Sequence, residues 1–173
     1  MRLFIAINFN KETKDYIQKV SQQLKECSQS GNFTKYNNLH LTLVFIGEVT
    51  EDKVFLIKTA MNKTIIKEFE LAFGGIDCFN RSGGDIFFVG VKMNEQLKNL
   101  NHFLFNELIK SGFIIEKKEY LPHLTLARQV KLKSKIDIDN EEISTLVNKI
   151  SLMKSERING QLIYSEIYSI FLK

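Results

Sequence analysis

The tetrapeptide His-Leu-Thr-Leu occurs twice in this chain, at residues 40–43 and again at residues 123–126. The copies lie almost half of the 173-residue length apart, and this spacing predicts two similar halves. The chain has only three histidines, and two of them begin these copies. A pair of groups that titrate near neutral pH is a complete acid and base set when both face one bond.

Side chains of a β-strand alternate between its two faces. His40 and Thr42 should therefore share a face, with Cα atoms about 7 Å apart, and so should His123 and Thr125. Strict alternation sends the intervening residues into a core, namely Leu39, Leu41, Leu43, Phe45, Leu124 and Leu126. A pseudo-twofold axis between the halves would bring both imidazole–hydroxyl pairs together across a cleft.

The hydrophobic pattern predicts an α+β fold in which two antiparallel sheets line a central cleft and helices lie outside. Strands are expected at 3–9, 39–47, 70–79, 86–92, 121–130, 143–153 and 162–172, and helices at 11–29, from Thr50 as N-cap, and at 94–111. A turn at 80–85 joins two of the strands into a hairpin. Residues 131–142 are expected to form a polar loop. We expect one bilobal domain over residues 1–173, with two interleaved lobes.

The composition is that of a soluble globular protein, 44% hydrophobic and 25% charged, with a net charge of +4. Such a mild positive balance favours polyanions without establishing nucleic-acid binding. Two cysteines cannot form a disulfide framework or a cysteine-type zinc site. The first residues lack the features of a signal peptide, and no stretch approaches a transmembrane length, so a cytoplasmic location is expected. The sequence carries no signal of oligomerisation, and a monomer is expected.

Two imidazoles and two hydroxyls around one centre suit a tetrahedral phosphodiester. One imidazole can remove a proton from attacking water while the other protonates the departing oxygen. The hydroxyls can donate to the non-bridging phosphate oxygens, where negative charge accumulates. This arrangement needs no metal and no cofactor. The third histidine, His102, falls on a helix away from its apolar stripe and serves as a surface residue in this interpretation.

The segment from Asn38 to Val49 closely resembles the first motif of the two-histidine (2H) phosphoesterases, and Pro122 to Arg128 resembles their second motif. The opening residues 2–7 and the closing Ser155, Gly160 and Tyr164 also resemble that family. The likeness spans essentially the whole chain and is greatest to the bacterial and archaeal RNA 2′,3′-cyclic phosphodiesterases, which are also called 2′-5′ RNA ligases.

This resemblance implies a bilobal fold with a V-shaped cleft and hydrolysis of a ribose 2′,3′-cyclic phosphate to a 2′-phosphate. It also implies reversible, ATP-independent 2′-5′ RNA ligation. The partner would be RNA with a cyclic phosphate end, or a cyclic nucleotide. His40 and His123 match the catalytic histidines, with His40 assigned as the general acid to the 3′-oxygen and His123 as the base. Thr42 and Thr125 match the phosphate-binding threonines.

Three further residues have two interpretations each. Arg128 matches a basic position of the second motif, but strict alternation places it opposite His123 unless the strand bulges after Leu126. Tyr120 could stack on a base or simply pack. Arg81, in the hairpin turn, could contact an RNA phosphate or remain a solvated turn residue.

Other functional classes fit less well. A metal hydrolase would need three or more ligands in a workable spacing, and neither His-Glu-x-x-His nor a cysteine or histidine cluster occurs. A nucleotide-driven ligase or kinase would need a glycine loop that ends in Lys-Ser or Lys-Thr, which the two Gly-Gly pairs lack. The main alternative is a catalytically silent RNA-binding module that uses the same basic cleft.

Overall fold

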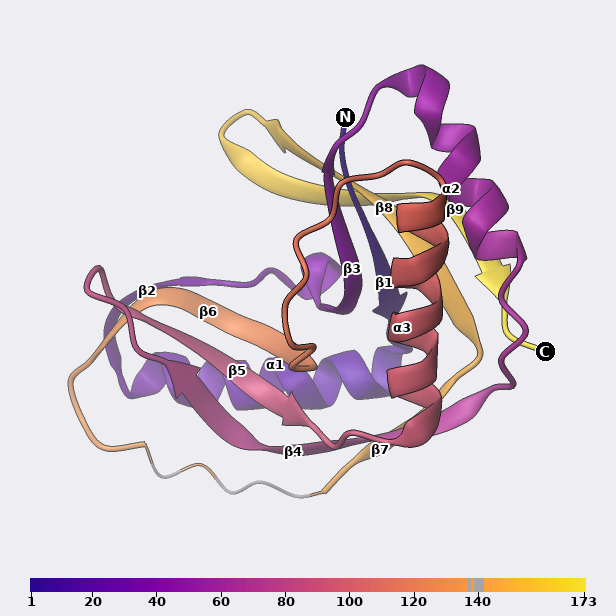
Figure 1. Cartoon of the computed structure of the whole chain (residues 1–173). Coiled ribbons are helices and arrows are strands. Elements are labelled where there is room, and N and C mark those ends of the chain that lie inside the picture. The colour runs from indigo at the N-terminus through magenta and orange to yellow at the C-terminus, as the bar shows by residue number, and fades with distance from the viewer. Residues whose placement is uncertain (137, 139–141) are drawn as a thin grey trace.

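A computed structural model describes residues 1–136, 138 and 142–173, and it has the predicted α+β architecture (Figure 1). Two antiparallel sheets form the framework, with strand orders β3-β1-β8-β9 and β2-β6-β5-β4-β7. The strands are β1 (Arg2–Asn8), β2 (Ser28–Phe33), β3 (His40–Glu48), β4 (Phe69–Phe79), β5 (Asp85–Val91), β6 (His123–Leu132), β7 (Ser144–Val147), β8 (Lys149–Ile158) and β9 (Gln161–Phe171).

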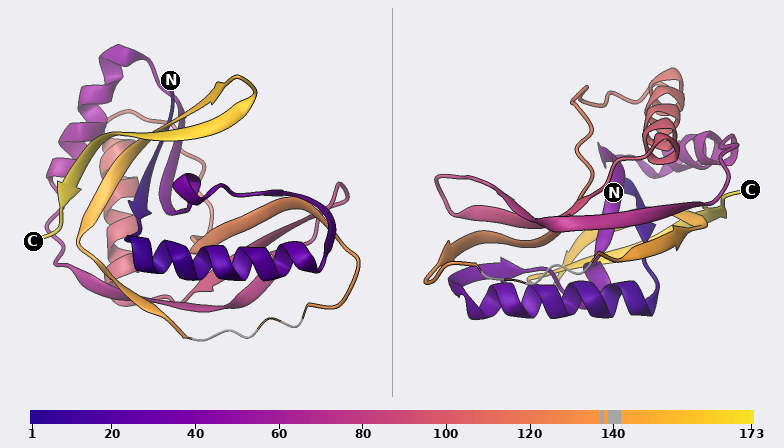
Figure 2. Two further views of the ribbon diagram at one scale, coloured as in Figure 1. Left: turned by 180° about the vertical axis from the view of Figure 1, so that it is seen from behind. Right: turned by 90° about the horizontal axis from the view of Figure 1, so that it is seen from below.

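Three α-helices within the described residues cover these sheets: α1 (Lys11–Glu26), α2 (Val54–Asn62) and α3 (Glu95–Lys110). Helix α1 packs against β2 and β6, whereas α2 and α3 pack on each other and on β9 and β3. Figure 2 shows α1 on one side of the molecule and the other two helices on the opposite side. Two short 3₁₀ turns, η1 (Tyr36–Asn38) and η2 (Glu51–Lys53), precede β3 and α2.

Helix α3 follows its predicted pattern closely. The Asn94 side chain caps it by accepting a hydrogen bond from the Leu97 amide at 2.8 Å. After its last turn, Gly112 takes a positive φ of 87°, a conformation that costs glycine little. Its four predicted leucines are completely buried in a core that also receives the back faces of both sheets (Leu97, Leu100, Leu104 and Leu108).

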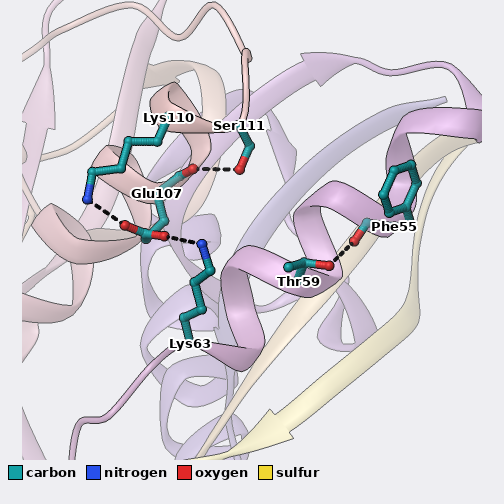
Figure 3. Close-up of polar contacts among 6 residues, drawn as sticks. All are labelled: Phe55, Thr59, Lys63, Glu107, Lys110 and Ser111. Atoms are coloured by element: carbon teal, nitrogen blue, oxygen red, sulfur yellow. Dashed lines mark hydrogen bonds and ion pairs between the residues drawn. The ribbon is translucent and has the colours of Figure 1, made fainter.

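A nearly buried carboxylate joins α2 to α3 (Figure 3). Glu107 accepts from the ammonium groups of Lys63, at 2.8 Å, and of Lys110, at 2.7 Å. These hydrogen bonds lower the pKa of the Glu107 carboxyl and keep it ionised. The pair of contacts therefore compensates the cost of placing a charge between two helices.

The two halves of the chain exchange strands between the sheets. Strand β2 comes from the first half but lies beside β6, whereas β8 and β9 come from the second half and extend the sheet of β1 and β3. The strand predicted at 143–153 is in fact two strands, because the chain leaves one sheet at Asn148. Strand β7 pairs with β4, and β8 pairs with β1 and β9.

Other predictions were wrong in detail. Helix α1 ends at Glu26, and residues 28–33 form the unpredicted strand β2. The Thr50 side chain makes no capping hydrogen bond, because a 3₁₀ turn separates it from α2. Strand β6 extends to Leu132, and part of the predicted 131–142 loop lies outside the described residues.

Candidate active site

A β-bulge interrupts the alternation of β3 just after its motif. Ile5 pairs with Val44 and Ala6 pairs with Thr42, so Leu43 is an extra residue in the ladder. Leu41, Leu43 and Val44 are consequently all buried, and the phase of the strand is inverted beyond them. Phe45 therefore lies on the same face as His40 and Thr42, and 48% of its surface is exposed. The prediction that Phe45 is a core residue was wrong for this reason.

Strand β6 carries a bulge in the matching place. Phe88 pairs with Thr125 and Phe87 pairs with Ala127, which leaves Leu126 extra. Leu126 and Ala127 are both buried, and the next residue, Arg128, is exposed on the face of His123 and Thr125. The bulge required for Arg128 to share a face with these residues is therefore present. We call this face and its counterpart on the other sheet the catalytic faces, after the role that we propose for them below.

Both imidazoles are held in the same way. His40 Nδ1–H donates to the carbonyl oxygen of Asn38 at 2.6 Å, and His123 Nδ1–H donates to that of Leu121 at 2.8 Å. A carbonyl can only accept, so each Nδ1 must carry a proton, and each Nε2 remains for proton transfer. In the neutral His40 ring, Nε2 accepts from the Thr42 hydroxyl at 3.0 Å.

Aromatic rings pack around each imidazole in a matched arrangement. The His40 ring lies 4.9 Å from Phe4 and 5.1 Å from Tyr164, measured between centroids. The His123 ring lies 5.4 Å from both Phe79 and Phe88, which stack on each other at 4.5 Å. These contacts restrict the rotation of each imidazole and keep its Nε2 on the catalytic face.

Strands β3 and β6 contact each other, and charges of one sheet influence titrating groups of the other. Burial lowers the pKa of His40 most, its hydrogen bond to the Asn38 carbonyl opposes that shift, and the charges of His123, Lys14 and Arg128 lower it further. Burial likewise raises the pKa of Tyr164, which Arg128 and Arg2 oppose. Groups of one sheet thus act on titrating groups of the other.

Strand β3 lies at the edge of its sheet, and side chains from elsewhere satisfy two of its outer carbonyls. Asn101 of α3 donates to the Leu43 carbonyl at 2.8 Å, at the bulge itself. The Tyr120 hydroxyl donates to the Thr42 carbonyl at 3.1 Å. These bonds cover an edge that would otherwise present unpaired backbone groups.

The contact of Tyr120 bears on its two interpretations. Its ring is partly buried against the core, and burial raises the pKa of its hydroxyl strongly. These observations favour packing over base stacking. Arg81 is exposed, and its amide donates to the Asp85 carboxylate at 3.0 Å, as in an ordinary solvated turn. His102 is exposed on α3, as predicted.

Sequence reasoning missed Lys14 as a neighbour of the site. This residue of α1 is half-buried, and its ammonium lies 5.8 Å from the ring centroid of Tyr36 in η1. Burial lowers the pKa of Lys14. No motif marks it, because its proximity to His40 arises from the packing of α1 rather than from the local pattern.

Among residues 1–136, 138 and 142–173, no cluster of three or more histidine, cysteine, aspartate or glutamate side chains could hold a metal ion. No helix within the same residues is long and apolar enough to cross a membrane.

Comparison with known proteins extends the likeness over nearly the whole chain. The family model described as the AKAP7 2′5′ RNA ligase-like domain matches residues 3–166. A protein of Thermotoga maritima named RNA 2′,3′-cyclic phosphodiesterase is 30% identical, with 97% of this chain and 94% of that protein covered. One of Methanocaldococcus jannaschii with the same name is 31% identical, with 96% and 98% covered.

Solved structures share the fold. E. coli LigT complexed with 3′-AMP superposes with a TM-score of 0.86 at 24% identity, covering 99% of this chain and 97% of that one. The fold, the paired motifs and the family match agree with the resemblance inferred from the sequence. The chain belongs to the AKAP7 2′5′ RNA ligase-like domain family of 2H phosphoesterases.

Proposed function

We propose that the protein hydrolyses the 2′,3′-cyclic phosphate of RNA ends or of nucleotides to a 2′-phosphate. The observation that carries this proposal is the matched anchoring of His40 and His123 on the contacting strands β3 and β6, which leaves the Nε2 atom of each ring for proton transfer. The names of the relatives in Thermotoga maritima and Methanocaldococcus jannaschii support the same substrate class. We place the reaction in the cytoplasm, in keeping with the sequence-based prediction.

The proposed step is an in-line displacement at phosphorus. A water oxygen forms a bond to phosphorus as the bond to the 3′-oxygen breaks, and the 2′-phosphate and a 3′-hydroxyl result. One imidazole accepts the proton of the water, and the other donates a proton to the 3′-oxygen. The ring that acted as the base then releases a proton to solvent, and the ring that acted as the acid takes one up. The atoms and charges balance without a metal ion or ATP.

The remaining residues stabilise the charge that develops on the phosphate. The hydroxyls of Thr42 and Thr125 donate to non-bridging oxygens, and Thr42 exchanges its His40 acceptor for the phosphate on binding. The Arg128 guanidinium adds a charged, forked donor on the same face. If a 5′-hydroxyl replaces the attacking water, the same groups form a 2′-5′ linkage, driven by the energy of the cyclic ester.

The structure bears on which histidine acts as the acid and which acts as the base. The sequence-based assignment makes His40 the acid and His123 the base. Burial lowers the pKa of His40, so the neutral ring, which is the form that a base needs, predominates in the free protein at neutral pH. The free protein therefore favours the reverse assignment. An anionic substrate beside His40 raises this pKa again, which would restore the acid role.

A leaving group that needs no proton separates the two assignments. With 3′-deoxyuridine 2′-(p-nitrophenyl phosphate), p-nitrophenolate leaves in place of the 3′-oxygen and no neighbouring hydroxyl can attack. A variant that lacks the acid should then recover most of its activity, whereas a variant that lacks the base should not. Recovery by His40→Ala alone establishes His40 as the acid, and recovery by His123→Ala alone reverses the assignment. Recovery by neither would contradict general acid catalysis by this pair.

Turnover of 2′,3′-cAMP in the presence of EDTA tests the function itself. His40→Ala and His123→Ala should each lose about 10²–10⁴-fold in kcat while RNA affinity is retained. A purified wild-type protein that binds RNA but turns over neither 2′,3′-cAMP nor an oligonucleotide with a cyclic phosphate end would instead be the silent binding module.

A further inference from the structure

The two bulges place corresponding residues of the motif strands on the catalytic faces. Arg128 follows His123 by five residues, and Phe45 follows His40 by five. Both side chains are exposed because each strand inverts its phase at the matching point. The halves of the site are thus alike in their histidines and threonines but differ here, with a cation on one strand and an aromatic ring on the other.

Phe45 is a large apolar residue exposed on the same face of β3 as His40. Nearly half of its surface is accessible, and the guanidinium of Arg2 lies 5.0 Å from its ring centroid. Both residues lie on the face of Phe4 and Thr42, because Phe45 pairs with Phe4 and Ala6 pairs with Thr42. An arginine held against an open ring on a catalytic face provides a flat, positively charged surface.

We infer that Phe45 and Arg2 bind the base of the nucleotide whose cyclic phosphate lies between the histidines. This inference rests on the proposed function and adds a base-binding site to it. Because of the bulge, Thr42 and Phe45 lie opposite Ala6 and Phe4, which are two residues apart on β1, so they are roughly 7 Å apart along the strand. That separation is comparable with the length of one nucleotide, so a phosphate at Thr42 leaves the base within reach of Phe45.

The chemistry of the pair favours stacking over reading of base edges. Every base offers a π-face to an aromatic ring, and an arginine plane strengthens the stack through its charge. Purines present the larger face and should bind better than pyrimidines. Because Arg128 attracts the phosphate and Phe45 attracts the base, a nucleotide binds in one orientation only, and this orientation determines which imidazole faces the 3′-oxygen.

A substrate without a base separates this site from the catalytic groups. Wild-type protein should have a kcat/KM for 2′,3′-cAMP about 10-fold or more above that for ribose 2′,3′-cyclic phosphate. Phe45→Leu should remove most of that preference, mainly by raising KM for 2′,3′-cAMP. Only this substrate carries a base that can contact Phe45. Phe45→Trp should retain the preference, and Arg2→Met should weaken it.

Phe55→Leu is the matched control, since Phe55 is 63% exposed on α2, and it should leave the preference intact. Thermal unfolding of each variant shows whether the fold is preserved. Equal turnover of both substrates by the wild-type protein would overturn the base site while leaving the hydrolase intact. An equal loss on both substrates in Phe45→Leu would also overturn it. If the wild-type protein turned over neither of these substrates nor an oligonucleotide with a cyclic phosphate end, the proposed function itself would be refuted.

Discussion

Arg128 reaches the catalytic face through a single extra residue in β6. As the proposed phosphate ligand, it should contribute through charge and through its forked geometry. Arg128→Met should lower kcat/KM for 2′,3′-cAMP by about 10²-fold, and Arg128→Lys should recover only part of this loss. Arg81→Met removes an equal charge from the β4–β5 turn and should change little. Steady-state kinetics with all three variants checks the assignment, and similar losses in Arg81→Met and Arg128→Met would contradict it.

Replacing Lys14 tests how a neighbouring charge affects the pKa of His40. Burial is the first cause of the low pKa of His40, so the value should stay below its ordinary range in Lys14→Met. It should nevertheless rise relative to wild type, because one charge that opposes protonation is removed. Titration of the imidazole by NMR measures this directly. Lys19→Met, on the exposed part of the same helix, should leave the pKa unchanged.

The pH–rate profile should show the same rise in the pKa of His40, and the role of His40 determines which limb moves. A base must be neutral, so a higher pKa moves the acid limb of kcat/KM to higher pH. An acid must be protonated, so the alkaline limb moves instead, also to higher pH. If the profile does not move while the pKa of His40 measured by NMR rises, then neither limb reflects the titration of His40.

The β4–β5 hairpin supports the bulged part of β6. Gly84 has a φ of +106°, and a Cβ there would lie 2.7 Å from the carbonyl carbon of Gln129 and 2.9 Å from its Cα. Gln129 itself has a positive φ of 54° and follows Arg128 directly. The turn and the bulge are therefore packed backbone against backbone, with no flexible side chain between them to absorb a change.

Gly84→Ala should consequently destabilise the protein by about 1–3 kcal/mol and also lower kcat/KM, since the shift reaches Arg128. Gly83→Ala is the control, because a Cβ at Gly83 meets nothing within 4 Å and should change stability by less than about 0.5 kcal/mol. Urea unfolding and kinetics on both variants check this. Equal midpoints for the two would show that the turn yields without strain.

The two bulges also show where the faces of the strands could not be predicted from the sequence. Runs such as Leu-Val-Phe-Ile after Thr42 are apolar throughout, so no alternation reveals where the phase inverts. Phe45 was misplaced for that reason, and the face of Arg128 could only be stated as a condition. Strand β2, with the sequence Ser-Gln-Ser-Gly-Asn-Phe, has little strand propensity of its own and is ordered by pairing with β6.

At the level of the whole molecule, the repeated motif predicted two sheets with paired sites, and the structure has both sheets. The exchange of strands between the halves was harder to predict, because strand pairing depends on contacts between residues that are far apart in the sequence. Apolar residues recur on both sides of Asn148, so the segment resembles one strand, and this resemblance hides a crossing from one sheet to the other. Lys14 and Tyr164 enter the site through such long-range packing, whereas the histidines and threonines could be identified from spacing alone.

Binding of inorganic phosphate tests whether the two halves form one site. A single phosphate held by His40, His123, Thr42 and Thr125 should stabilise the fold by about 1.4 kcal/mol at ten times its Kd. For a chain of this size, that gain raises Tm by roughly 3–6 °C. Chloride at equal ionic strength should not reproduce it, because general screening does not require a tetrahedral anion.

The same titration, followed by NMR, should shift the imidazole signals of His40 and His123 with one common Kd, while exposed His102 stays unchanged. Each single variant, His40→Ala or His123→Ala, should lose most of the gain in Tm, since each removes one of the two imidazoles that hold the phosphate. Two distinct affinities at the two histidines would mean that the sheets hold separate anions. A full gain in both variants would place the anion elsewhere. Either result contradicts a shared phosphate, on which the proposed proton transfer across one phosphorus depends.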